Sequence, residues 1–147
     1  MPVDFTNVFY DNIMESLATV INGEFKTPVY YDSHKGNQSF LLSPVADNFI
    51  TFLSTGQQRE YEIQISYQLK TGGQYTKLNI KQVSLIMERL KKLIYNNKIY
   101  NNGSVWFDAH LPSIEYLRDE DDDTLLKGVA TFNCNSIEVI TWKLKAN

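Results

Sequence analysis

The chain has 147 residues, 43% hydrophobic and 21% charged, which is the size and composition of one globular domain and excludes a disordered or fibrous chain. Its net charge of −3 argues against general nucleic-acid binding, which usually requires a basic face. The single cysteine, Cys134, excludes an intrachain disulfide. No segment approaches the ~20 apolar residues of a membrane span and no signal peptide is recognised, so we expect a protein of a cytoplasm-like compartment.

The first predicted element is an amphipathic helix over residues 4–21, in which apolar residues recur at helical spacing. Asp4 or Thr6 is expected to cap its start, and Gly23 stands where a helix stop is expected.

Residues 24–55 are predicted to be extended. The expected strands are short and cover residues 27–31, 39–42 and 48–53, and Pro44 is expected to end the second of them.

The clearest predicted strand covers residues 60–69, where apolar residues alternate with polar ones, so one face of its sheet is expected to be packed. A turn over residues 70–74 follows. A second helix is predicted over residues 79–95, with an apolar stripe at positions i, i+3, i+4 and i+7 and with basic residues on its other face.

Three further extended segments are predicted over residues 105–111, 113–117 and 125–134, and the tail over residues 137–144 is read as one further strand. The order of elements predicts a single α+β domain, residues 1–147, with a core over residues 4–134. Its architecture is a mostly antiparallel β-sheet with two amphipathic helices packed on one face. Residues 135–147 are interpreted as an extra strand or arm.

No catalytic set, cofactor motif or metal site is recognised, so we expect a protein that is not an enzyme. Asp108 and His110 are expected on the same side of a strand, where a surface pair is the favoured interpretation. Asp32 and His34 lie in a turn region, and Cys134 is interpreted as a small buried hydrophobe.

Charge is distributed unevenly along the sequence. The acidic run over residues 119–123 lacks the ligand pattern of a calcium loop and is usually solvated, but it would also repel DNA phosphates on a channel wall. The second helix carries six basic residues and one acid over residues 77–98. A solvated face is the ordinary explanation, and a contact with an acidic surface on a neighbouring copy is the alternative.

The pattern resembles the tail terminator (tail completion) proteins of long-tailed bacteriophages. The resemblance rests on Thr27-Pro28-Val29-Tyr30 after the first helix, on the strand at residues 60–67, on the helix at residues 83–90, and on residues 126–132 as the last core strand. It covers roughly residues 4–134, and these are patterns of elements rather than invariant residues.

The resemblance implies a structural virion protein of the tail and neck, assembled in the host cytoplasm. Six copies would form a ring that caps the tail tube and joins it to the head–tail connector protein, with genomic DNA passing through the centre. The partners would be the chain itself, the tail tube protein and the connector, with no membrane. Association would use exposed strand edges and apolar patches.

Three groups of candidate site residues follow. The lumen candidates are Asp119, Glu120, Asp121, Asp122 and Asp123. The subunit-interface candidates are Lys81, Arg89, Lys91, Lys92 and Trp142. The candidates for docking on the tube or connector are Gln57, Gln58, Arg59, Thr71, Gly72, Gly73, Gln74 and Tyr75. The alternatives are another neck, connector or tail tube component, a small ligand-binding or enzymatic domain, and a small cytoplasmic binding or immunity-type domain.

Overall fold

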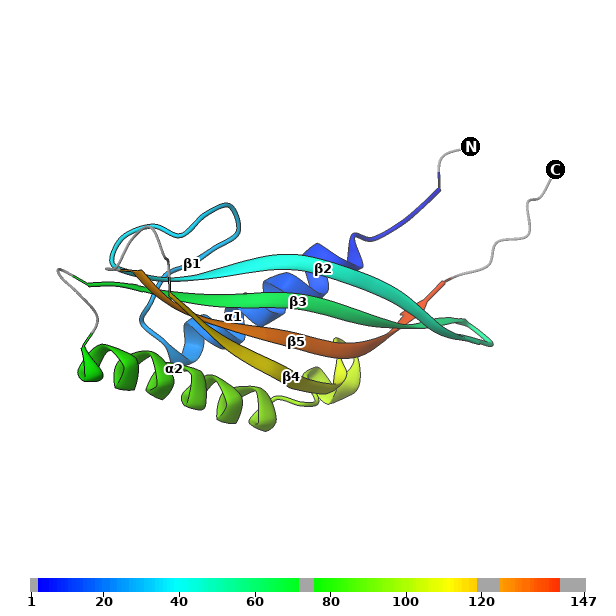
Figure 1. Cartoon of the computed structure of the whole chain (residues 1–147). Helices are drawn as coiled ribbons and strands as arrows, with labels where there is room; N and C mark the ends of the chain where they lie inside the picture. Colours follow the sequence, from blue (N-terminus) through cyan, green and yellow to red (C-terminus); the bar gives the residue numbers. More distant parts are fainter. Residues whose placement is uncertain (1–2, 72–75, 119–124, 141–147) are drawn as a thin grey trace.

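The computed structural model confirms an α+β fold and describes residues 3–71, 76–118 and 125–140 (Figure 1). Its sheet has five strands in the order β1-β2-β3-β5-β4. Pairing is antiparallel except between β1 and β2, which run parallel. The strands are β1 (Val29–Tyr30), β2 (Gln38–Leu53), β3 (Gly56–Lys70), β4 (Phe107–Arg118) and β5 (Leu125–Val139).

Two helical elements cover one face of the sheet, which we call the covered face. The first is a π-helical segment, η1 (Val8–Met14), that continues into α1 (Glu15–Glu24); the second is α2 (Lys77–Asn96). A short 3₁₀ turn, η2 (Asn101–Gly103), follows α2. The predicted packing of both helices on one face is therefore correct, and the opposite face, the open face, carries no helix (Figure 1).

The alternation of apolar and polar residues over 60–69 correctly predicts which side chains of β3 enter the core. The apolar side chains of this strand point to the covered face and are buried, and they are Tyr61, Ile63, Ile65, Tyr67 and Leu69. The α2 stripe meets them through Val83, Met87, Leu90 and Ile94, which are also buried. On the next strand Gly128 lies so close to Met87 that a Cβ would stand 2.6 Å from its sulfur, which fixes how closely α2 approaches β5.

The helix boundaries differ from the prediction. Asn7, rather than Asp4 or Thr6, caps the first helix, because its side chain accepts a hydrogen bond from the Tyr10 N–H. Gly23 does not stop the helix: it lies inside α1, which ends at Glu24, and its backbone is not left-handed.

The strands are longer than predicted because several predicted breaks are β-bulges. Pro44 does not end a strand: β2 continues through it with a register shift between Pro44 and Ala46. The shift is tolerated because β1 pairs only with Phe40 and Leu41, so the distal part of β2 has a partner on one side only. The predicted segments 105–111 and 113–117 likewise form the single strand β4, which carries register shifts on both sides of His110.

The tail is not a separate strand in its described part. β5 continues without interruption to Val139, and Ser136 is buried, so the ordered pairing extends beyond residue 134. Together the ends of β2, β3 and β5 project past α1 and form what we call the arm, comprising residues 45–53, 56–60 and 135–139 (Figure 1).

Candidate interaction surfaces

A chain of polar contacts links the strands of the arm on its covered side. Arg59 donates a hydrogen bond to Asp47 across the strands at 2.8 Å, and Asp47 raises the pKa of that guanidinium. Gln57 donates to Glu138 at 3.0 Å, and the Tyr61 hydroxyl donates to the other oxygen of the same carboxylate. Burial, followed by Glu138, raises the pKa of Tyr61, so the hydroxyl stays a donor. These contacts join all three strands of the arm.

Aromatic side chains extend beyond this polar chain toward the arm tip. The rings of Phe49 and Phe52 lie 4.8 Å apart, and the Arg59 guanidinium is 6.0 Å from the Phe49 ring. Phe52 is 79% exposed, which is unusual for a large apolar side chain in a paired strand. The residues opposite them, Arg59 and Gln57, share this covered side of the sheet.

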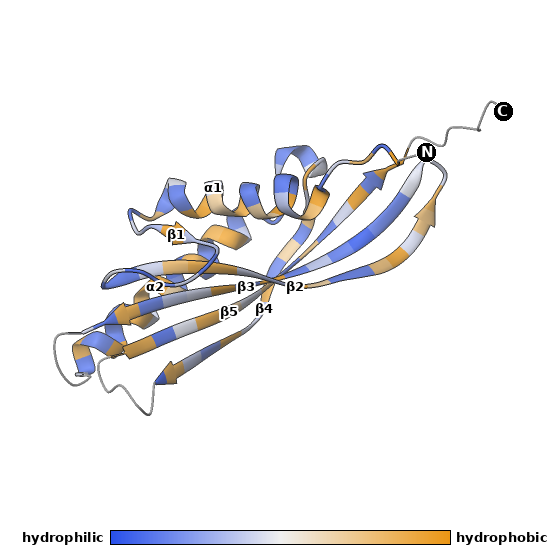
Figure 2. Ribbon diagram, turned by 90° about the horizontal axis from the view of Figure 1, so that it is seen from above, coloured by the Kyte–Doolittle hydropathy of each residue, from blue (hydrophilic) through white to orange (hydrophobic). Residues whose placement is uncertain are grey.

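The open side of the arm is apolar at its tip as well. In β5, Ile137 and Val139 alternate with Glu138 and therefore point to the open face, and Val139 is 73% exposed. Leu53 pairs with Gly56, which in turn pairs with Val139, so the three positions form one row. Figure 2 shows hydrophobic residues continuing into the ends of β2 and β5. A sheet end that is apolar on both sides is typical of a contact surface rather than of a solvated hairpin.

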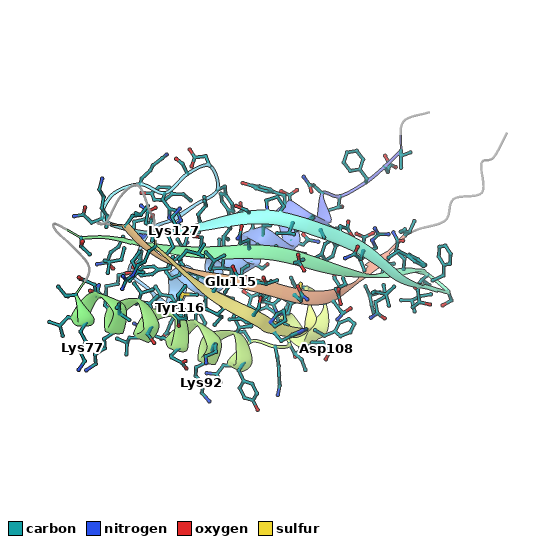
Figure 3. All side chains as sticks on the ribbon, in the orientation of Figure 1. Lys77, Lys92, Asp108, Glu115, Tyr116 and Lys127 are labelled. Atoms are coloured by element: carbon teal, nitrogen blue, oxygen red, sulfur yellow. The ribbon has the colours of Figure 1, made fainter. Side chains whose placement is uncertain are left out.

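The α2 helix carries a second exposed apolar line. Leu78, Leu85 and Tyr95 are 74%, 63% and 61% exposed and lie on the side opposite the buried stripe. Lys81 and Lys92 flank them on the same side. Figure 3 places Lys77 and Lys92 on the side of α2 that points away from the sheet.

The four described interface candidates divide into two kinds. Arg89 is engaged within the chain: it pairs with Glu24 at 2.8 Å, donates to the Glu24 carbonyl oxygen at 2.8 Å, and lies 4.8 Å from the Phe25 ring. Lys91 pairs with Glu88 on the same helix at 2.7 Å. Lys81 and Lys92 form no ion pair within the described residues, although the Lys92 ammonium lies 5.3 Å from the Tyr95 ring, so these two can pair with a carboxylate on a partner.

The docking candidates lie at opposite ends of one strand. Gln57, Gln58 and Arg59 are in the arm and bond to other arm residues, among them Asn135, which accepts from Gln58 at 3.3 Å. Thr71 follows the other end of β3. It stands fourteen residues after Gln57, which is about 45 Å along an extended strand. The two groups cannot form one docking surface. Gly72, Gly73, Gln74 and Tyr75, the acidic residues 119–123 and Trp142 lie outside the described residues.

Sequence reasoning missed the role of His34, which closes residues 31–37 onto the open face. Its Nδ1 lies 2.7 Å from Ser39 Oγ and its Nε2 lies 2.9 Å from Ser66 Oγ, and both serines are buried. Burial first, and then the charge of Lys127, lower the pKa of His34 to about 4, so the ring is neutral at neutral pH. No local pattern signals this contact, because Ser66 is 32 residues away.

The remaining titratable candidates offer no catalytic arrangement. Asp108 has a left-handed backbone (φ 53°), and the His110 Nδ1 donates to the Asp108 carbonyl oxygen at 2.9 Å rather than to its carboxylate. Asp32 pairs with Lys35. The prediction for Cys134 is confirmed: it is fully buried, and burial raises the pKa of its thiol to about 12, with the Glu60 charge a lesser cause.

Across residues 3–71, 76–118 and 125–140, no group of three or more His, Cys, Asp or Glu side chains is placed to hold a metal ion. No helix in that part of the chain has the length and hydropathy to cross a membrane.

The comparisons with known proteins add no relative. No protein-family model matches the chain, and a search of the curated proteins finds no match. The resemblance to tail terminator proteins therefore stays a prediction that rests on the pattern of elements.

Proposed function

We propose that this chain is a structural subunit of a homo-oligomeric ring in a bacteriophage virion. In this proposal it is the tail terminator, which caps the tail tube and joins it to the head connector, with DNA passing through the centre. Six copies are the proposed number, and the chain performs no catalysis.

The observation that carries the proposal is the arm. A monomeric protein rarely leaves a projecting sheet end apolar on both sides, because each exposed apolar side chain forgoes the stabilisation of burial. Phe49 and Phe52 on one side and Ile137 and Val139 on the other are all exposed. An arm that contacts one partner on each side accounts for both sets.

The order of elements gives further support. Val29 and Tyr30 form β1, the first strand after the first helix, and the central amphipathic strand, the second helix and the closing strands follow in the order that the resemblance describes. The two helices α1 and α2 also favour a terminator over a tail tube subunit, for which a more barrel-like sheet is expected.

The first experiment measures native mass over a wide concentration range and images the same samples by negative-stain electron microscopy. Rings with a central hole support the proposal, whereas open tubes formed by the chain alone favour a tube subunit. The second experiment measures co-sedimentation with purified tail tubes. A chain that forms no ring and binds no tube contradicts the proposal and favours the small cytoplasmic binding domain.

A matched pair of variants identifies the docking side of the arm. Phe52→Ser removes the most exposed aromatic ring of the arm and is expected to weaken co-sedimentation with tubes. Tyr116→Ser removes a half-exposed ring near the far end of β4 and is expected to leave co-sedimentation unchanged. Equal binding by both variants would contradict the assignment of the Phe49–Phe52 side to docking.

A further inference from the structure

Two exposed surfaces of this chain are opposite in charge and similar in length. The first, the open patch, lies on the open face of the distal sheet and consists of Leu53, Glu60, Glu62, Ile137 and Val139. The second, the α2 ridge, lies on the solvent side of the second helix and consists of Leu78, Lys81, Leu85, Lys92 and Tyr95. Neither surface contacts the other within one chain, because the open face and α2 lie on opposite sides of the sheet (Figure 1).

The two surfaces carry opposite charges. Glu60 and Glu62 follow each other on the open side of β3, and neither forms an ion pair in the described part of the chain. The α2 helix carries five basic residues and one acid, and that acid, Glu88, is held by Lys91. The acids on the covered side of the arm differ, because Asp47 is paired with Arg59 and Glu138 accepts from Tyr61 and Gln57.

The two surfaces are also of similar length. From Leu78 to Tyr95 the ridge is ~25 Å long at the rise of an α-helix. From Glu62, which pairs with Asn133, to Val139 the open patch is ~20 Å long at the rise of a strand. Gly56 stands between Leu53 and Val139, and the Glu138 carbonyl oxygen lies where its Cβ would be, so backbone rather than a third side chain separates the two apolar residues.

We propose that the open patch of one copy packs against the α2 ridge of a second copy. Lys81 and Lys92 reach inward along the helix to Glu62 and Glu60, and Tyr95 lies against Ile137 and Val139. The helix thereby covers a sheet face that is bare in the single chain. The contact joins two different surfaces, so each copy uses both and the assembly closes into a ring when the rotation between copies allows it. The inference rests on the proposed function and specifies its subunit interface.

Charge reversal tests this contact directly. Glu60→Lys with Glu62→Lys reverses the patch, and Lys81→Glu with Lys92→Glu reverses the ridge. Each double variant alone sets like charges against each other at every contact. We expect the dissociation constant for self-association in low salt to rise about tenfold or more, because two opposite-charge pairs become repulsive.

Mixing the two double variants supplies a rescue that a folding defect cannot imitate. In an alternating assembly, the intact ridge of the patch variant meets the intact patch of the ridge variant. The next contact joins a reversed patch to a reversed ridge, which again pairs opposite charges. The mixture is therefore expected to recover the native mass of the wild-type assembly, as is the quadruple variant in one chain.

The control variants are Asp11→Lys and Lys26→Glu, which change exposed charges on the first helical element and just after it, away from both surfaces. They are expected to associate like the wild type. Far-UV circular dichroism and thermal unfolding of every variant establish that it is folded, and Glu60→Gln with Glu62→Gln is the milder replacement if the lysines unfold the arm.

Three results would overturn the inference. The first is wild-type association in the two double variants, the second is failure of their mixture to recover, and the third is a wild-type chain that stays monomeric in low salt at every concentration. Loss of duplex DNA binding by the ridge variant, with association intact, would instead assign the ridge to nucleic acid. Co-sedimentation with tail tubes separates the two proposals, since tube binding that survives any of these results leaves the terminator function standing.

Discussion

Acidification should loosen the contact by which His34 holds residues 31–37 on the open face. The neutral ring bridges Ser39 and Ser66, and its pKa falls from the usual 6.5 to about 4 because of burial and, secondarily, Lys127. Above about pH 6.5 neither the folded nor the unfolded chain protonates this histidine, so its full contribution to stability is present. As pH falls toward about 4, the unfolded chain takes up a proton that the folded chain does not, and stability decreases.

The size of this effect follows from the shift. At ~1.4 kcal/mol for each pH unit, the upper limit is ~3 kcal/mol. The ring is only partly buried, and solvent screening reduces the expected loss to ~1–2 kcal/mol. The carboxylates of the chain titrate in the same range, so the measurement needs a reference protein that lacks only this group.

His34→Gln provides that reference. Urea unfolding of the wild type and the variant at neutral pH and at about pH 4.5 gives two differences in the free energy of unfolding. The variant is expected to be less stable at neutral pH, because it leaves a buried serine hydroxyl without its partner, and the difference should shrink by ~1–2 kcal/mol in acid. A difference of the same size at both pH values would refute the account of His34 as a buried neutral bridge.

Three further predictions concern the arm, the helix pair and the core. Gly56→Ala places a Cβ 1.8 Å from the Glu138 carbonyl oxygen, so it should separate β3 from β5 in the arm and speed amide exchange there, whereas Gly23→Ala, with nothing within 4 Å, should raise stability by ~0.5–1 kcal/mol. Arg89→Ala should lower the free energy of unfolding by up to ~1 kcal/mol through loss of Glu24 and Phe25 contacts, while self-association, measured by sedimentation, stays unchanged. Cys134 should react with a thiol reagent at about pH 8 only at the rate of unfolding, and reaction of the folded protein would contradict its burial.

The elements that could be predicted from sequence are those whose pattern reflects burial directly. The alternation around Ile63 and Ile65 and the helical stripe through Met87 and Leu90 identify the two central elements and their packed faces. Each of these elements has one apolar face that must be buried, so the spacing of its apolar residues in the sequence indicates which face packs against the core.

The boundaries could not be predicted because they depend on neighbours. Pro44 ends a strand only where its missing N–H is needed, and the edge position of β2 removes that need. The same holds for exposure: residues 48–53 were predicted to form a strand, but only the position of the arm beyond α1 determines that Phe49 and Phe52 meet solvent. Candidate residues such as Arg89 were assigned to a partner because a charge pattern does not reveal a contact with a distant segment of the same chain.

The edges of the sheet are consistent with the proposed association through faces rather than through strand pairing. β4 is the outer strand on one side, and it contains Pro112, two register shifts and the left-handed Asp108. On the other side the distal part of β2 contains Pro44 and two register shifts. Each interruption removes donors or bends the edge away from a flat ladder, which disfavours open-ended strand addition. The proposed contact between the open patch and the α2 ridge uses side chains instead, and it gives a closed ring rather than a fibre only when the rotation between copies brings the last copy back to the first.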